Sequence, residues 1–170
     1  GLIEEAKSTL QRDGLRYDRD VQVGGMIEVP AAALAADAFA RELDFLSIGT
    51  NDLMQYTLAT DRIDETVNHL FDPLNTGVLR LIHSIIRAGN SAGIPVSMCG
   101  EMAGDARFVP LLLGMGLREF SMQPGALLDV REQIRDLDTA ELTRSANRLL
   151  DNLDRGDDSI ALLEQLGIVH

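Results

Sequence analysis

The chain alternates between short apolar segments and longer stretches with helical periodicity, and this alternation restricts its possible folds more than any other feature. Four segments of strand length each run into polar or glycine-rich residues. These segments are Val21–Glu28, Asp44–Asn51, Pro95–Glu101 and Glu119–Gln123. Strands that are separated by helices generally pair in parallel through right-handed crossovers. The sequence therefore predicts an α/β fold with a parallel sheet.

Apolar residues at helical spacing fill the intervals between these segments. The clearest stripe is closed by Gly93 and followed by Pro95, and both residue types commonly end helices. Its members are Val78, Leu81, Ile82, Ile85 and Ile86. We also expect an opening helix that ends at Gly14 and helices over residues 30–43 and 105–114. Helices and strands thus alternate along the first part of the chain.

Beyond Gln123 the pattern predicts helices alone. The apolar face of the first consists of Leu142, Ala146, Leu149, Leu150 and Leu153, and that of the second consists of Ile160, Leu163 and Leu166. Asp154–Asp158, which contains a glycine and three acidic residues, is typical of a turn between them. We therefore expect residues 124–170 to close the fold with helices.

Composition narrows the possible partners and the cellular compartment. The formal net charge of −12 argues against binding to a nucleic acid or insertion into an anionic membrane. No apolar run approaches the length of a membrane span, and a single cysteine suits a reducing cytoplasm. The first residue is Gly1, inside a segment of helical periodicity, so we expect the chain to be part of a longer polypeptide.

Three successive strand-like segments end in residues that can bind or react. These residues are Glu28, then Asn51 with Asp52, then Cys99 with Glu101. In parallel α/β folds the carboxyl ends of the strands meet at one edge of the sheet, where functional residues collect. One polar strand end would be unremarkable, whereas three in succession predict a site.

Glu28 and Asp52 are candidate magnesium ligands. Two carboxylates from neighbouring strands are a typical protein contribution to a Mg²⁺ site, which is completed by water and substrate oxygens. The alternative is structural: Glu28 forms a cap or salt bridge, and Asp52 begins a helix after the Gly-Thr-Asn turn. Spacing alone leaves both interpretations open.

Arg62 and Cys99 have two interpretations each as well. Arg62 lies in a loop-like stretch, where an arginine is commonly a solvated surface charge, but near a metal its guanidinium can hold a phosphate or a carboxylate. A lone cysteine is usually a small buried apolar group. Cys99, however, is followed by glycines and acidic residues, so an open loop can expose it. With an ordinary pKa of about 8.5, a thiol is protonated at neutral pH and can act as an acid.

Four sequence segments resemble segments of a known enzyme family. Met26–Ala31, Ser47–Leu53, Gln55–Arg62 and Met98–Asp105 resemble the phosphoenolpyruvate-utilising enzymes, and among them enzyme I of the bacterial phosphotransferase system. The likeness runs along nearly the whole chain. It implies that residues 1–170 are part of a phosphoenolpyruvate-binding (β/α)8 TIM-type barrel. Residues 1–123 would supply the last four βα units, and residues 124–170 would supply the closing helices.

The resemblance also implies roles for the residues at the strand ends. Glu28 and Asp52 correspond to Mg²⁺ ligands in that family. Asn51, Asp52 and Arg62 correspond to phosphoenolpyruvate contacts, with Arg62 on the phosphate. Cys99 corresponds to the acid that protonates the enolate carbon to give pyruvate. Such an enzyme passes phosphate to its own histidine and then to the phosphocarrier protein HPr.

The resemblance does not make this chain a complete enzyme. The family's phosphohistidine domain and the first half of the barrel lie outside it, so we expect the isolated chain to be inactive. A homodimer is implied, because the family's C-terminal domain is dimeric. Three alternatives remain open from the sequence: a fragment of pyruvate phosphate dikinase or phosphoenolpyruvate synthase, a non-catalytic oligomerisation module, and a complete small open α/β sheet.

Overall fold

The computed structural model of the chain describes residues 1–152 and residue 164. The strands are β1 (Gly24–Ile27), β2 (Phe45–Gly49), β3 (Val96–Cys99) and β4 (Glu119–Phe120). The α-helices are α1 (Leu2–Arg12), α2 (Pro30–Leu34), α3 (Ala36–Glu42), α4 (Thr50–Leu58), α5 (Thr76–Ala92), α6 (Glu101–Gly104), α7 (Val109–Gly114), α8 (Leu127–Arg135) and α9 (Thr139–Asn152). Short 3-10 turns are η1 (Asn68–Leu70), η2 (Ala106–Phe108) and η3 (Pro124–Ala126).

The four strands form one parallel sheet whose strand order, β1-β2-β3-β4, is the order of the chain. Each strand lies inside one of the four segments that the sequence predicts, so the expectation of a parallel α/β fold is confirmed. The strands are shorter than those segments. Residues at both ends of the segments leave the ladder, and at the carboxyl ends they enter loops or helices.

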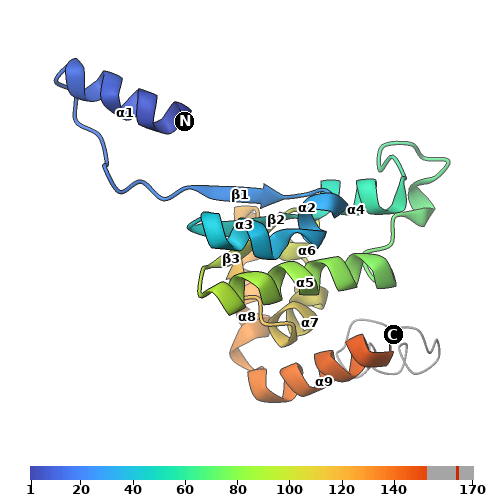
Figure 1. Cartoon of the computed structure of the whole chain (residues 1–170). Helices are drawn as coiled ribbons and strands as arrows, with labels where there is room; N and C mark the ends of the chain where they lie inside the picture. The colour runs from blue at the N-terminus through green and yellow to red at the C-terminus, as the bar shows by residue number, and fades with distance from the viewer. Residues whose placement is uncertain (153–163, 165–170) are drawn as a thin grey trace.

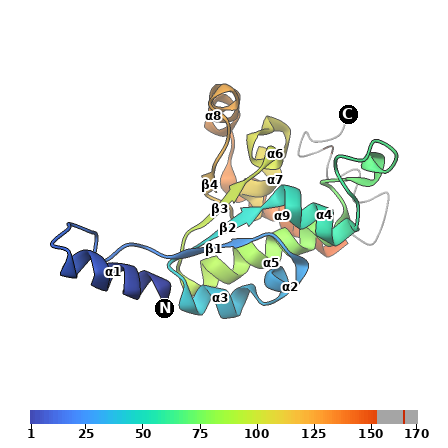
Figure 2. The same ribbon diagram turned by 90° about the horizontal axis from the view of Figure 1, so that it is seen from above.

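The two faces of the sheet differ in burial. Ile27, Ile48 and Met98 are partners in register and at most 1% exposed, because they face the layer formed by α2, α3 and α5 (Figures 1 and 2). The preceding residues, Met26 and Ser47 among them, point to the opposite face because side chains alternate along a strand. Met26 is 48% exposed. In the part of the chain that the structure describes, this second face is thus incompletely covered.

Helix α5 anchors the covered face. The predicted stripe is confirmed for Val78, Ile82, Ile85 and Ile86, which are fully buried, whereas its fifth member, Leu81, is only partly buried. The Asn75 side chain caps the helix by accepting a hydrogen bond from a backbone N–H of the first turn. Gly93 ends it with φ +73°, a left-handed conformation that favours glycine. Local signals at both ends therefore agree with the burial pattern between them.

The predicted helix over residues 30–43 is two helices. Ala35 has φ −102° and ψ 17° and separates α2 from α3. The break lets α2 pack against α4 and α5 while α3 packs against α5 and β2. The opening helix is present as α1, but it buries none of its side chains and is drawn apart from the other helices in Figure 1.

The first of the two helices expected after residue 123 is present as α9 as far as residue 152, and it is preceded by α8, which the sequence pattern did not predict. Leu142, Ala146 and Leu149 of the predicted face are buried, and α9 packs along α7 (Figure 1). The predicted turn at Asp154–Asp158 and the whole of the second apolar face lie outside the described residues. Among the described helices, none combines the length and the apolar character that crossing a membrane requires.

Candidate active site at the carboxyl ends of the strands

The ends of the first three strands bring the predicted site residues to one edge of the sheet. Glu28 directly follows β1, Gly49 ends β2 and Cys99 ends β3. Gly49 pairs with Cys99, and the pairing of Ile27 with Ile48 makes Glu28 the neighbour of Gly49 on the other side. Adjacent strands are about 4.8 Å apart, so the backbones of Glu28 and Cys99 lie roughly 10 Å apart across β2.

Gly49 leaves the space that the Glu28 carboxylate uses. A side-chain carbon added at Gly49 would lie 3.0 Å from Glu28 Cβ, 3.1 Å from Glu28 Oε2 and 3.1 Å from Met26 Sδ. All three distances are shorter than ordinary van der Waals contact. The missing side chain thus allows the half-buried Glu28 to lie over the end of β2, towards the strand that bears Cys99.

The Cys99 thiol lies on the incompletely covered face of the sheet. Its Sγ is 3.6 Å from the carbonyl oxygen of Ile48, to which the S–H can donate, and 3.8 Å from Met26 Sδ. The Ser47 hydroxyl can donate to the same sulfur over 3.9 Å. The side chain is half-buried. The thiol therefore has weak polar partners and access to the side of the sheet on which Glu28 lies.

The segment after Cys99 is attached to the segment after β2 by two hydrogen bonds. The buried Thr50 hydroxyl donates to the Cys99 carbonyl oxygen at 3.0 Å. The Glu101 backbone N–H donates to Asn51 Oδ1 at 3.2 Å. Gly100, between these two contacts, has φ +103°, and a side-chain carbon there would collide with Thr50 Oγ1. The Asn51 carboxamide oxygen is thus engaged, which directs its NH₂ group elsewhere.

Asp52 follows the end of β2 in the chain, within the first turn of α4, whereas Arg62 lies beyond the end of α4. Asp52 is half-buried in the first turn of α4, three residues beyond Gly49. That position agrees with the structural alternative, in which Asp52 begins a helix, and also keeps Asp52 at the carboxyl edge. Arg62 lies in an exposed turn beyond α4, where its backbone N–H donates to Gln55 Oε1 at 3.3 Å. Among the described residues, the Arg62 guanidinium forms no hydrogen bond or ion pair with Glu28, Asp52 or Cys99.

A hollow of about 1000 Å³ opens beside Cys99. Asn51, Glu101, Asp105, Arg107 and Asp129 line it together with Cys99, and so do Gly100 and Gly104, which follow β3, and Gly125, which follows β4. Arg107 forms a 2.6 Å ion pair with Asp105, and its hydrogen bonds lower the Asp105 pKa below 3.8. Glu28, Asp52 and Arg62 are not among the residues that line this hollow. It is therefore adjacent to the carboxylates rather than centred on them.

The strand ends carry carboxylates, a ligand type that Mg²⁺ prefers, but the described residues do not enclose a metal site. Among the described residues, no three His, Cys, Asp or Glu side chains group closely enough to hold a metal ion. Two carboxylates that leave most positions to water and to substrate are the usual arrangement for Mg²⁺ with a phosphorylated substrate. The glycine gap at the end of β2 gives the Glu28 carboxylate room to act in this way.

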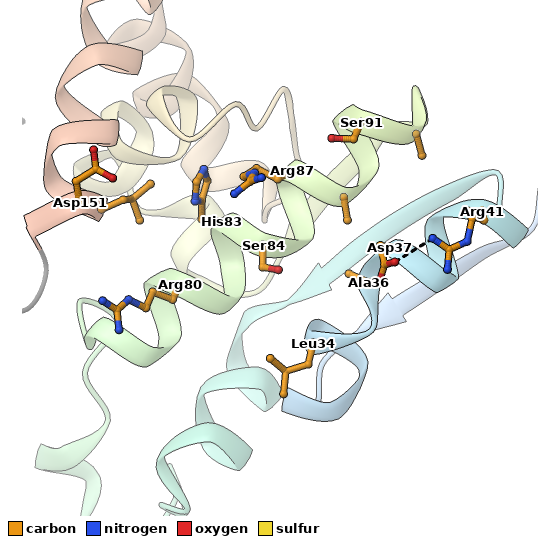
Figure 3. A pocket seen from close by; sticks show the side chains of 13 residues that line it. Leu34, Ala36, Asp37, Arg41, Arg80, His83, Ser84, Arg87, Ser91 and Asp151 are labelled. Atoms are coloured by element: carbon orange, nitrogen blue, oxygen red, sulfur yellow. Dashed lines mark hydrogen bonds and ion pairs between the residues drawn. The ribbon is translucent and has the colours of Figure 1, made fainter.

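A second hollow, of about 690 Å³, lies on the outer surface between α3, α5 and α9 (Figure 3). His83 and Arg87 lie side by side on α5, with Asp151 of α9 beyond them, while Asp37 of α3 pairs with Arg41 at 2.9 Å on the other side. Burial and the charge of Arg87 lower the pKa of His83, and Asp151 opposes this shift. Charges of both signs line this hollow, so it does not favour a ligand of either sign.

The comparisons with known proteins now bear on the strand ends. Residues 1–139 match the family model described as the phosphoenolpyruvate-binding domain of the PEP-utilising enzymes, which is more than half of the chain. The chain belongs to the PEP-utilising enzymes. Within that family, it is similar to proteins named phosphoenolpyruvate-protein phosphotransferase, and the resemblance expected from the four strings is confirmed.

Three such phosphotransferases show the extent of the likeness. The Enterococcus faecalis protein is 48% identical over 164 residues, which cover 96% of this chain and 28% of that protein. The Cupriavidus necator protein is 52% identical over 161 residues, which cover 95% and 28%. The Staphylococcus aureus protein is 49% identical over 150 residues, which cover 88% and 26%. The chain therefore spans a little more than a quarter of the length of these relatives.

Of the residues that connect the strand ends, sequence reasoning identified Asn51 but missed Gly49, Thr50 and Gly100. Gly49 and Gly100 make close approaches possible, and Thr50 and Asn51 hold the Cys99 segment. A signal for them exists, because Gly-Thr-Asn and Cys-Gly-Glu each follow a strand of the same sheet. Parallel neighbours bring such strings together, but the hydrogen-bonded register needed to pair them requires coordinates.

Proposed function

We propose that the chain is the C-terminal part of the phosphoenolpyruvate-binding domain of a phosphoenolpyruvate–protein phosphotransferase. The observation that carries the proposal is the common edge of three strands: Glu28, Asn51 with Asp52, and Cys99 lie there in a chain about half identical to proteins of that name. The whole enzyme would transfer phosphate from phosphoenolpyruvate to its own histidine and then to the phosphocarrier HPr.

In this proposal Glu28 and Asp52 hold Mg²⁺. The bound ion supplies electrostatic stabilisation of the negative charge that forms on the enolate oxygen when phosphate leaves. Asn51 donates from its carboxamide NH₂ to a substrate oxygen, since its Oδ1 is already bonded to Glu101. Arg62 binds the phosphate from its exposed turn beyond α4.

Cys99 protonates the enolate that remains after phosphoryl transfer. The S–H bond breaks, and the electron pair of the enolate C=C bond forms a new C–H bond at the methylene carbon. The enolate oxygen becomes the ketone oxygen of pyruvate, and sulfur keeps its electron pair as a thiolate that regains a proton from water. The half-buried thiol, with only weak partners at 3.6 to 3.9 Å, is suited to release that proton.

We further propose that the sheet is the last half of a (β/α)8 barrel. The strand order supports this, since consecutive parallel neighbours with α2, α3 and α5 on one face are the repeating unit of such a barrel. The other face would be the barrel interior. Residues 1–123 would then supply four βα units and residues 124–170 the closing helices of a dimeric cytoplasmic protein.

The test uses the full-length protein that contains this chain. We expect Cys99→Ala to abolish pyruvate formation. The Mg²⁺ concentration that gives half-maximal phosphoenolpyruvate binding should stay unchanged in this variant. Glu28→Ala should instead raise that Mg²⁺ concentration at least tenfold, roughly the effect of losing support for a metal ligand. Full turnover by Cys99→Ala would refute the proton-donor role, and an unchanged Mg²⁺ requirement in Glu28→Ala would refute the metal site.

A further inference from the structure

Thr50 and Asn51 form a clamp on the segment Cys99–Glu101, and the clamp involves backbone atoms on both sides of Gly100. Thr50 Oγ1 donates to the carbonyl oxygen of Cys99 at 3.0 Å, and Asn51 Oδ1 accepts from the N–H of Glu101 at 3.2 Å. Thr50 is 0% exposed, so its hydroxyl has no access to water as an alternative partner. Two bonds in opposite directions fix this segment in both position and rotation.

The backbone at Gly100 depends on the same contact. Its φ of +103° and ψ of −178° are favourable only for glycine. A side-chain carbon there would collide with Thr50 Oγ1 and lie 3.0 Å from Asn51 Oδ1. The turn after Cys99 is therefore closed tightly against the first residues of α4. The direction in which the Cys99 thiol points follows from where this turn is held.

We propose that Thr50 is the positioning residue for the Cys99 thiol and ties the proton donor to the segment that carries Asn51 and Asp52. The catalytic consequence rests on the proposed function, in which Cys99 protonates the enolate. Asn51 and Asp52 follow Thr50 directly in the chain, so one short segment sets the place of the substrate and metal contacts and also the place of the thiol. Thr50 itself touches neither the reacting carbon nor the metal.

A simple structural role for Thr50 is distinguishable from this one. The hydroxyl and the methyl group of threonine can be removed separately: Thr50→Ser keeps the donor, and Thr50→Val keeps the volume but not the donor. A residue that merely fills space should tolerate valine better than serine. A residue that holds Cys99 through its hydroxyl should show the reverse order.

The experiment measures two quantities in the full-length protein that contains this chain. The first is alkylation of Cys99 by iodoacetamide without substrate or metal, followed by mass spectrometry of the peptide that contains Cys99. The second is kcat and KM for pyruvate formation. In Thr50→Val we expect alkylation about fivefold faster, the factor associated with one lost hydrogen bond. We also expect kcat about tenfold lower from the misplaced thiol, whereas Thr50→Ser stays within about twofold of the unsubstituted protein in both quantities.

Equal alkylation rates and equal kcat in Thr50→Val and the unsubstituted protein would overturn the proposal, as would loss of function in Thr50→Ser equal to that in Thr50→Val. If Thr50→Val does not fold by circular dichroism, Gly100→Ala tests the same clamp, because its new side-chain carbon displaces Thr50 Oγ1. It should likewise raise the alkylation rate, and an unchanged rate would overturn the proposal. Full turnover by Cys99→Ala would overturn the proposed function instead, while the alkylation rates would still decide whether Thr50 holds the thiol.

Discussion

The close approach of Glu28 to Gly49 allows a quantitative prediction about metal binding. In Gly49→Ala the new methyl group would lie 3.0 Å from Glu28 Cβ, 3.1 Å from Glu28 Oε2 and 3.1 Å from Met26 Sδ. Ordinary carbon contacts begin near 3.5 Å, so Glu28 must shift by about half an ångström. Met26 is partly exposed and can yield, which places the stability cost near the lower end for overpacking, about 1 kcal/mol.

The larger effect should fall on Mg²⁺. Displacing one of two carboxylates from its place should weaken metal affinity about tenfold, comparable to losing support around a ligand. The assay is the Mg²⁺ concentration for half-maximal phosphoenolpyruvate turnover in the full-length protein, together with thermal unfolding. Gly1→Ala is the matched control, since nothing lies within 4 Å of a side-chain carbon at Gly1 and this residue lies outside the candidate site. An unchanged Mg²⁺ requirement in Gly49→Ala would refute the idea that the Glu28 carboxylate works over the end of β2.

Three further predictions concern other parts of the molecule. In Gly114→Ala the added carbon would lie 2.6 Å from the Leu142 carbonyl oxygen, an atom of the α9 backbone, so urea denaturation should show about 2–3 kcal/mol less stability. The His83 pKa is lowered by burial and by Arg87, so its NMR titration should have a midpoint below 6.5 that rises in Arg87→Gln. Because the folded state disfavours the charged imidazole, stability should fall as the pH decreases through and below 6.5, and an unshifted midpoint would contradict this account. The isolated chain should bind phosphoenolpyruvate weakly at best, transfer no phosphate and associate in sedimentation experiments through its incompletely covered sheet face; a monomer across concentrations would argue against that association.

Periodicity was sufficient to predict the sheet and its main helices. The α5 stripe and the four strand segments carry one dominant signal each, a buried face of period 3.6 or a short apolar run. The break at Ala35 could not be predicted, because an alanine-rich stretch favours helix on both sides of it and only packing on α5 and β2 separates the two. At Ala35 the local helix propensity favours one continuous helix, whereas the tertiary contacts favour two separate helices, and the structure contains two.

The polar and reactive residues of the candidate site could be predicted from the sequence. The hydrogen bonds that connect them could not. Glu28, Asn51, Asp52 and Cys99 stand out because polar groups at strand ends are costly without a purpose. Thr50 has an ordinary side chain that any turn could contain, and its importance arises only from meeting the Cys99 carbonyl across the sheet. Contacts between residues 49 positions apart follow from register, which periodicity does not encode.

The packing of α9 on α7 extends this unit past the residues that the family model matches. The family match stops at residue 139, where α9 begins, yet Leu142, Ala146 and Leu149 are buried. A polypeptide that ends at residue 139 would lack α9, and the apolar surface of α7 that α9 covers would be exposed to solvent. Exposed apolar surface of this kind promotes aggregation. Anyone excising this portion for biophysical work should therefore retain the chain at least through Asn152.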